Sequence, residues 1–487
     1  MSKKWEVILV GAVVVALGFL RFYNLGHSEY IPDETTVLYP LKESRGFSRE
    51  FFLNQRKGPL QFVISYIPFI FEKNIFDEGV FRLPFAIAST LSLVFFYLFI
   101  RNISGRKLVA LLSTFLIGVC GFTVGLGRIV QYQGLNLLFS SAALYFYSLI
   151  LIGSTKRRLV NSLLGTFFCC LSLLSHWDAV FYFPIMFWIF GRLLIDKDVP
   201  RDFKIKIIIT NIFLSMLLLL PFLLPYIKSI SASNLEYFET RVGAGGENNT
   251  FIEKLTGYKS KVDLYNPFYY LWLILGSAAL AFLNFRRTKA VFSWFIINFL
   301  IFLLFIKHEG THLYNLFIPL SILSGFGLTL LIDKFNRVWK IIIATLTFVP
   351  LLFFFYQSFL VFACVQKEYP FERETILGRE TKRYTHKQLP NNVIGFPIRR
   401  GWVEINEYLK ELGYPRYITN ENQSISNFYV EGMYGEGEGV YYIIGIKKPL
   451  SFTLDYSFPQ VKGKHTVKEI DVSGSTTAKI YIVDGQR

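Results

Sequence analysis

Long apolar segments follow one another through the first three quarters of the chain, and they constrain its fold more than any other feature. A helix needs about 20 residues to cross the hydrocarbon core of a membrane, and about 17 are tolerated. The 487-residue chain is 52% hydrophobic, more than a soluble fold of this length could bury. The sequence therefore predicts a polytopic α-helical membrane protein with about eleven spans, near residues 6–22, 80–100, 108–126, 134–153, 159–175, 178–195, 205–227, 268–284, 290–306, 313–332 and 338–362.

One further apolar run, residues 60–76, decides the topology, because counting it as a span would reverse every later loop. Cytoplasmic loops are enriched in Lys and Arg. If residues 60–76 lie in the interface, the main basic clusters share the side of the N-terminus: Arg101/Arg106/Lys107, Lys156/Arg157/Arg158, Lys197/Arg201/Lys204/Lys206, Arg286/Arg287/Lys289 and Lys334/Arg337/Lys340. We therefore predict an interfacial or re-entrant helix at 60–76 in a multi-pass protein of the cell membrane. Its N-terminus is then cytoplasmic and its chemistry lies on the outer face.

The formal net charge of +16 is explained by this topology. The basic residues stand in short clusters between apolar segments, with little sign of the interleaved aromatic residues that stack on bases. We expect contacts with membrane lipids and no nucleic-acid partner.

The composition changes near residue 366 to that of a soluble domain. The sequence predicts two domains, a transmembrane domain at 1–365 and a small external α/β domain at 366–487. In the second domain, the spacing of apolar residues predicts a helix at 401–412 and strands at 440–446 and 478–483. The outer loop 228–267 has a Gly-rich core at 243–249, and two interpretations stay open for it: a lid over the site, or a plain unordered loop.

An adjacent pair of carboxylates, Asp33 and Glu34, follows the first apolar segment on the predicted outer face. Neighbouring side chains do not face the same way on a helix. One carboxylate is therefore expected to face the site, while the other caps the following helix or binds a cation. The alternative is purely structural, because Pro32 followed by two acidic residues is also typical of a helix start.

Four cations on the same face are candidates for binding an anionic phosphate: Lys57, Arg82, Arg128 and Lys307. A guanidinium can bind phosphate through two parallel hydrogen bonds, which makes the two arginines suitable. Arg128 is one of few cations in the short outer loops. For Lys57, anchoring of the helix at the membrane interface explains the sequence equally well.

A second group of polar residues lies at two outer helix junctions. His176 and Asp178 flank Trp177, and either a polar turn or catalysis explains them. The segment from Lys307 contains His308 and His312, whose spacing could ligate a metal, but no second ligand pair with a recognisable pattern is present. A divalent metal is kept as an open alternative, and no other cofactor is expected.

The order of several motifs resembles that of the GT-C membrane glycosyltransferases. These motifs are the outer Asp-Glu pair, Lys57-Gly58-Pro59-Leu60, Phe81-Arg82-Leu83-Pro84, Ser104-Gly105-Arg106-Lys107 and Gly127-Arg128-Ile129-Val130. The similarity covers about residues 5–360 and is greatest to glycosyltransferase family 39, with its protein mannosyltransferases, lipid A aminoarabinose transferases and bacterial relatives. Many relatives carry an acidic residue a few positions after the arginine of the last motif. This chain has Gln131, Tyr132 and Gln133 there.

The resemblance implies a polyprenyl-phosphate-linked sugar donor and inverting transfer to a hydroxyl of a lipid, glycan or protein acceptor. It implies Asp33 as the catalytic base or acceptor-orienting group, supported by Glu34, and a site lined by His176, Asp178, His308, His312 and Tyr314. Two other functions are weighed against it. A lipid or polysaccharide transporter would need charged residues near the middle of its spans, which are nearly absent here. A non-catalytic scaffold of the same fold would tolerate the loss of Asp33.

Overall fold

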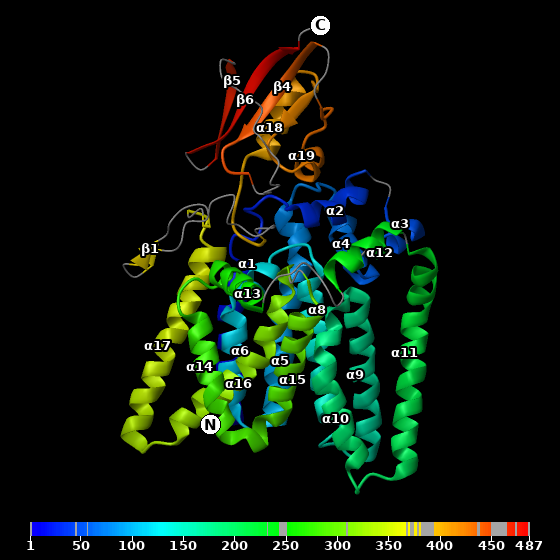
Figure 1. Cartoon of the computed structure of the whole chain (residues 1–487), viewed down its shortest axis with the longest axis vertical. Coiled ribbons are helices and arrows are strands. Elements are labelled where there is room, and N and C mark those ends of the chain that lie inside the picture. The colour runs from blue at the N-terminus through cyan, green and yellow to red at the C-terminus, as the bar shows by residue number, and fades with distance from the viewer. Residues whose placement is uncertain are drawn as a thin grey trace.

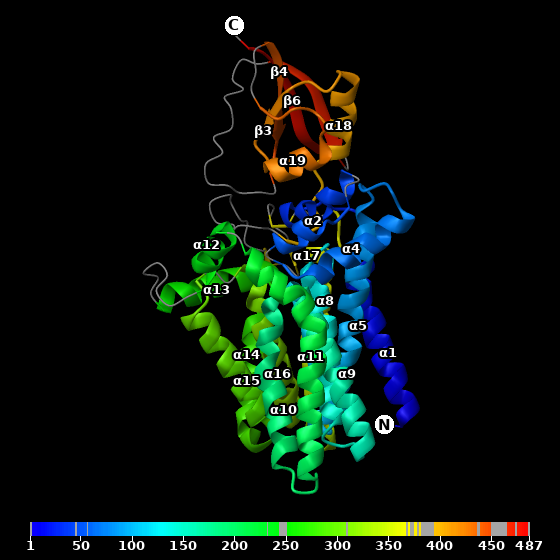
Figure 2. The same ribbon diagram turned by 90° about the vertical axis from the view of Figure 1, so that its right-hand side faces the viewer.

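The computed structural model describes residues 2–43, 46–55, 57–230, 232–242, 251–307, 310–366, 369–370, 375–376, 379–380, 394–435, 439–449, 465–472 and 475–485. Long helices form a bundle, and a small sheet domain covers one end of it (Figure 1). The N-terminus lies at the opposite end from this domain (Figures 1 and 2). The predicted class, a polytopic helical protein with a C-terminal α/β domain, is confirmed.

Among the described residues, eight helical stretches are long and apolar enough to cross a membrane. They contain α1 (Lys3–Phe22), α5 (Glu78–Ser104), α9 (Thr155–Ser175), η1 with α10 (Trp177–Tyr182 and Phe183–Ile195), α11 (Arg201–Ser229), α14 with η2 and α15 (Tyr270–Ala281, Phe282–Asn284 and Phe285–Leu304), η3 with α16 (Gly310–Leu313 and Tyr314–Asp333) and α17 (Arg337–Phe362). Helix α16 is the most buried of them, and it packs against α14 and α6 (Lys107–Val119).

The predicted count of eleven spans exceeds these eight for three reasons. The predicted span at 108–126 is divided at Cys120 into α6 and the short α7 (Gly121–Leu126). The span at 134–153 is α8 (Tyr132–Leu149), whose buried polar side chains lower its hydropathy. The spans at 268–284 and 290–306 are joined in one helical stretch, which breaks at Asn284, where φ is −122° and ψ is 46°.

Ion pairs show which loops share one end of the bundle. Glu6, near the N-terminus, binds Arg101 at 3.2 Å, and Arg106 binds Asp333 at 3.1 Å. The predicted grouping of these basic clusters with the N-terminus therefore agrees with the structure. The side of the membrane on which that end lies stays a prediction.

The opposite end carries the short helices α2 (Pro32–Lys42), α3 (Arg49–Leu53), α4 (Pro59–Phe71), α12 (Ala232–Arg241) and α13 (Phe251–Tyr265). Helix α4 has 13 residues, about 20 Å, which is too short for a hydrocarbon core of about 30 Å. Its length agrees with the interfacial helix predicted at 60–76. The Gly-rich core predicted at 243–249 lies outside the described residues.

The C-terminal domain has a four-stranded sheet in the order β3-β4-β6-β5. The strands are β3 (Tyr417–Thr419), β4 (Gly439–Ile446), β5 (Thr466–Val472) and β6 (Ser475–Gly485), and the helices are α18 (Trp402–Glu411) and α19 (Gln423–Tyr429). Residues before them form a two-stranded sheet of β1 (Thr375–Ile376) and β2 (Arg379–Glu380). The predicted helix and both predicted strands are present, and β4 pairs with β6 in antiparallel register.

The sheet domain packs against the loop that precedes α2. Buried Glu29 accepts hydrogen bonds from the backbone N–H groups of Arg400, Gly401 and Trp402, at 2.6 to 2.8 Å, and so caps the start of α18. The hydroxyl of Tyr429 accepts from the backbone N–H of Tyr30 at 2.7 Å. Helix α19 lies over α2 (Figures 1 and 2). These contacts fix the position of the chain just before Asp33.

Candidate functional site

Asp33 is presented at the first turn of α2, at the end of the bundle that carries the sheet domain. The helix begins at Pro32, whose fixed φ suits the first helical position. The Asp33 side chain is 42% exposed, and its carboxylate lies 3.7 Å from the ammonium of Lys57, whose side chain is 21% exposed. The pair is thus open to a ligand and also partly shielded from solvent.

The surroundings of Asp33 favour its charged form. Burial alone would raise the pKa of Asp33, but Lys57, the side chain of Gln131 and Arg241 together lower it below its ordinary value. Asp33 is therefore a carboxylate at neutral pH. Such a group is a good acceptor of hydrogen bonds and a weak base.

Glu34 points the other way, into the protein. Its two oxygens accept hydrogen bonds from Arg82 at 2.8 and 2.7 Å, and both side chains are buried. Glu34 also accepts from the backbone N–H of Ile31 at 3.1 Å and from that of Val130 at 2.8 Å. The carboxylate thus ties α2, α5 and the loop before α8 together, and it is withdrawn from the surface that Asp33 shares with Lys57.

The other cations predicted for phosphate binding are engaged by the protein. Arg82 also donates to the backbone oxygens of Ser28 and Glu29. Arg128 is buried and donates to four carbonyl groups at the end of α1, those of Leu20, Arg21, Tyr23 and Asn24. The ammonium of Lys307 donates to the backbone oxygen of Glu239 at 2.7 Å. Of the four predicted cations, the structure places Lys57 beside Asp33.

Arg241 is a site residue that the sequence did not single out. It ends α12, within the predicted outer loop 228–267, and its charge contributes to the lowered pKa of Asp33. Its backbone oxygen accepts from the backbone N–H of Lys307 at 2.8 Å. The only available signal was a cation within an outer loop.

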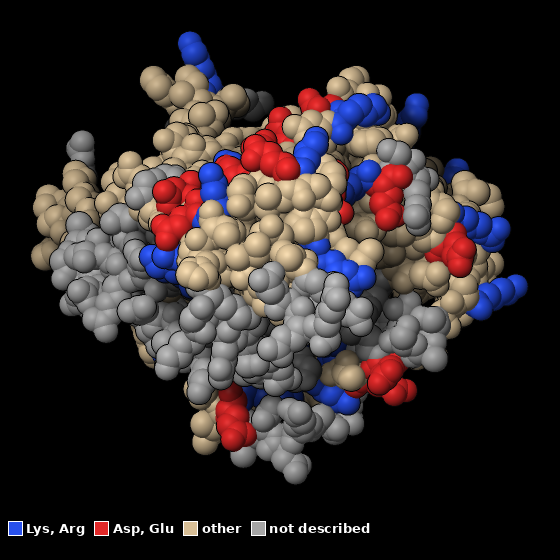
Figure 3. Space-filling view, turned by 90° about the horizontal axis from the view of Figure 1, so that it is seen from above, with Lys and Arg blue, Asp and Glu red and all other residues tan. Residues whose placement is uncertain are grey.

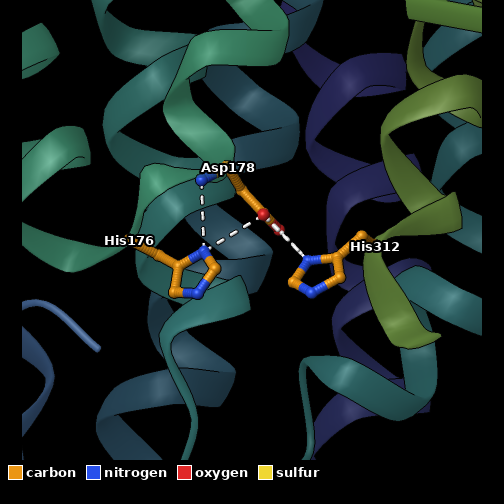
Figure 4. A group of neighbouring side chains, drawn as sticks. All are labelled: His176, Asp178 and His312. Carbon is orange, nitrogen blue, oxygen red and sulfur yellow. Dashed lines mark hydrogen bonds and ion pairs between the residues drawn. The ribbon is translucent and has the colours of Figure 1, made fainter. Parts of the chain in front are cut away.

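A second cluster joins His176, Asp178 and His312 (Figure 4). One oxygen of Asp178 lies 3.0 Å from Nδ1 of His176 and 2.8 Å from Nδ1 of His312. The other oxygen accepts from the hydroxyl of Tyr314 at 3.0 Å. Asp178 comes from η1 and His312 from η3, so the cluster connects two helix junctions that lie far apart in the sequence. His308 lies outside the residues that the structure describes.

The ligand atoms of this cluster lie within 4.8 Å of one another, which fits a cation held by two imidazoles and one carboxylate. Burial lowers the pKa of His176 to about 4, so its imidazole is neutral at pH 7, as metal ligation requires. However, Nδ1 of His176 also lies 3.1 Å from the backbone N–H of Asp178. A hydrogen-bonded cluster without metal therefore explains the same geometry.

Residues 131–133 join the two clusters. Gln131 lies beside Asp33. Tyr132 stacks on the imidazole of His176 at a centroid distance of 3.6 Å, and Gln133 donates to Thr311 at 3.4 Å. The three residues that depart from the acidic pattern of the relatives thus connect the Asp33 pair to the histidine cluster.

Gly58 allows Lys57 to reach this place. The backbone N–H of Gly58 donates to the carbonyl oxygen of Ser175 at 3.2 Å, and a Cβ at position 58 would lie 1.9 Å from the carbonyl oxygen of Leu174. Only glycine permits such an approach. Lys57 thereby lies 3.7 Å from Asp33, and its charge contributes to lowering the pKa of both Asp33 and His176.

No protein-family profile matches this chain, and no curated protein matches it in sequence. Solved structures do match in fold. ArnT from Cupriavidus metallidurans, bound to undecaprenyl phosphate, aligns over 99% of this chain and 98% of its own, with a TM-score of 0.56 and 11% identity. The oligosaccharyltransferase AglB from Archaeoglobus fulgidus, in complex with an inhibitory peptide and a dolichol-phosphate, aligns over 91% of this chain and 69% of its own, with a TM-score of 0.55 and 13% identity.

A further match covers less of both molecules. The chain aligns over 47% of its length with 35% of a chain in the S. cerevisiae Pmt1-Pmt2 protein O-mannosyltransferase complex, with a TM-score of 0.40 and 16% identity. ArnT and AglB, each aligned over more than 90% of this chain, are membrane glycosyltransferases. The chain thus has the fold of the GT-C membrane glycosyltransferases, as the order of its sequence motifs indicates.

Proposed function

We propose that this protein transfers a sugar from a polyprenyl-phosphate-linked donor to an acceptor hydroxyl, with inversion at the anomeric carbon. The observation that carries this proposal is the open, ionised Asp33 carboxylate beside the Lys57 ammonium. This pair lies in a fold whose solved examples were bound to undecaprenyl phosphate and dolichol-phosphate. The basic end of the bundle carries the N-terminus, which supports a cytoplasmic N-terminus and a site on the outer face of the cell membrane.

In this mechanism the two charges near the surface have different roles. Lys57 and Arg241 bind the donor phosphate and stabilise the negative charge that grows on it as the bond to the sugar breaks. Asp33 accepts a hydrogen bond from the acceptor hydroxyl, directs its oxygen at the anomeric carbon and receives its proton as the new bond forms. Polyprenyl phosphate is a good leaving group, so a weak base suffices. Most of the rate enhancement comes from positioning.

A cavity of about 600 Å³ offers room for the acceptor. It lies between α2 and α19 and is lined by Thr36, Tyr39, Phe51 and Asn427, among other residues. Thr36 stands three residues after Asp33 and so shares its face of α2. An acceptor in this cavity would reach Asp33 from the side of the sheet domain.

The donor class is tested by supplying membranes that contain the protein with labelled sugar on polyprenyl phosphate or on a nucleotide. We expect label to enter endogenous acceptors from the lipid-linked donor alone. Direct transfer from the nucleotide donor in membranes freed of polyprenyl phosphate would contradict the proposal. Movement of intact labelled lipid across the membrane, without cleavage of the sugar, would indicate a transporter.

Lys57→Gln tests the role of the ammonium. Losing a hydrogen bond to a charged phosphate should weaken kcat/KM for the donor about 10- to 100-fold. Because Lys57 lowers the pKa of Asp33, the variant should also lose activity at a higher pH than the parent as the solution is acidified. In the parent, Asp33 stays ionised down to at least its ordinary pKa of about 4. Lys57→Arg keeps the positive charge, so its activity should fall at the same acidic pH as that of the parent. If the activity of Lys57→Gln also falls at the pH of the parent, Lys57 does not have the proposed effect on Asp33.

We also propose the His176, Asp178 and His312 cluster as the place where this chain would hold a divalent cation. Such a cation would add positive charge at the wall of the site. We expect the purified protein to contain about one metal equivalent by mass spectrometry, and Asp178→Asn to lose it. A metal-free parent protein that remains active in chelator would leave the hydrogen-bonded cluster as the correct interpretation.

A further inference from the structure

A cavity outside the candidate site gathers several basic side chains in its lining. It has a volume of about 370 Å³ and lies where the loop after α1, the segment after α17 and the sheet domain meet. Its lining includes the five basic residues His27, Arg399, Arg400, Lys447 and Lys448, and no Asp or Glu among the residues that the structure describes. These residues come from three separate parts of the chain, so the fold itself has gathered them.

Two carboxylates lie near this charge among the described residues. Glu404 binds Arg399 at 2.8 Å, and Glu29 is occupied by three backbone N–H groups at the start of α18. Burial lowers the pKa of His27, and the charges of Arg399 and Arg128 lower it further. Seen from the side of the sheet domain, basic and acidic side chains are interspersed over the described part of the surface (Figure 3). An acid-free cavity with four Lys and Arg residues is therefore a local feature.

The cavity also offers hydrogen-bond donors of the kind that bind phosphate. Thr476, at the start of β6, lines its wall. The neighbouring hydroxyls of Ser475 and Thr477 donate to backbone oxygens of the protein. Buried Arg400 donates to the backbone oxygen of Lys448 at 2.6 Å, so its guanidinium is held at the wall by the protein. Lys447 is exposed and lies at the opening. The arrangement thus combines a fixed guanidinium with an exposed ammonium and the hydroxyl of Thr476.

The position of the cavity relates it to the membrane. Val365 and Gln366, which line it, directly follow α17, the last membrane-spanning helix. Helix α17 lies at the outside of the bundle (Figure 1), and the large side chains of Val349, Leu352 and Tyr356, in the half of the helix that leads to the cavity, are exposed. A lipid whose chains lie along α17 would place its phosphate at the level where this helix ends.

We propose that this basic cavity binds a phosphate-bearing anion, and that the anion is supplied by the head group of an anionic membrane lipid. The site shares no residue with Asp33, Lys57 or the histidine cluster, and it does not depend on the proposed transfer reaction. Binding there would tie the sheet domain to the membrane surface at the junction with the helical bundle.

The test measures lipid binding to the purified full-length protein in a phosphate-free detergent by native mass spectrometry, with phosphatidylglycerol and zwitterionic phosphatidylcholine as probes. We expect the parent to retain phosphatidylglycerol preferentially. The double variant Lys447→Gln/Lys448→Gln should bind it about tenfold more weakly, or weaker still. The matched control Lys410→Gln/Lys468→Gln removes two exposed lysines of the same domain that do not line the cavity, and it should bind as the parent does.

Glycerol phosphate added as a competitor separates the two sources of phosphate. Retention of lipid in its presence assigns the site to a lipid head group, whereas displacement at a comparable concentration assigns it to a soluble phosphate ester. Equal binding of both lipids by the parent would overturn the proposal. An equal loss in both double variants would overturn it as well, because it would show a general effect of surface charge. Unfolding temperatures matching the parent's establish that the variants are folded.

Discussion

Arg82→Leu is expected to destabilise the fold by about 3–5 kcal/mol, because it would leave the carboxylate of Glu34 buried and without its cation. The two side chains share two hydrogen bonds of 2.7 and 2.8 Å and are almost completely shielded from solvent. Leucine also removes the donors to Ser28 and Glu29 in the loop that supports α2. The effect should appear as a low yield of folded protein and a lowered unfolding temperature in detergent.

Glu469→Gln is the matched control for this prediction. Glu469 pairs with Lys479, but both side chains are nearly half exposed, so losing the pair should cost less than about 1 kcal/mol. Glu34→Leu combined with Arg82→Leu should recover only part of the stability, since the N–H groups of Ile31 and Val130 would still lack their acceptor. If Arg82→Leu unfolds at the temperature of the parent, the structural role assigned to the Glu34 and Arg82 pair is wrong.

The coarse fold could be predicted from the sequence because each of its signals is local. The lengths of apolar segments indicate membrane-spanning helices, and basic clusters indicate which loops lie at the same end of the bundle. The spacing of apolar residues in 401–412 indicates the buried face of a helix, which carries Trp402 and Leu409. The number of long spans could not be predicted in the same way. Tertiary contacts stabilise α8 although its buried polar residues make it less apolar than an isolated span.

The roles of the arginines could not be predicted from local sequence. Arg82 and Arg128 both stand at ends of predicted spans, where a phosphate ligand and a buried structural cation have the same pattern. The difference lies in acceptors that are distant in sequence. Glu34 is 48 residues before Arg82, and the carbonyl groups of α1 that bind Arg128 are more than 100 residues before it.

Several other residues of the site could not be predicted from local sequence either. Gln131, Tyr132 and Gln133 gave no signal beyond a departure from the family pattern, yet they connect Asp33 with the histidine cluster. Arg241 lies in a long loop whose sequence gave no reason to single it out. Asp33 itself was found because an acidic pair next to a proline in an outer loop is a local feature.

Asp33→Asn is expected to lower the rate of sugar transfer about 10²- to 10⁴-fold, the usual contribution of a group that takes up a proton in the transition state. Asparagine keeps the shape of the side chain but cannot receive the proton of the acceptor hydroxyl. Since Asp33 is 42% exposed, the variant should fold as the parent does. Asp263→Asn is the matched control: Asp263 is 43% exposed and also paired with a lysine, Lys259, and its replacement should leave the rate unchanged.

The most direct test of this account is the initial rate of sugar transfer from a labelled polyprenyl-phosphate donor in membranes that contain equal amounts of the parent, Asp33→Asn or Asp263→Asn protein. We predict transfer by the parent and by Asp263→Asn, and a rate near background for Asp33→Asn. Transfer by Asp33→Asn at the rate of the parent would contradict the central claim that Asp33 acts on the acceptor.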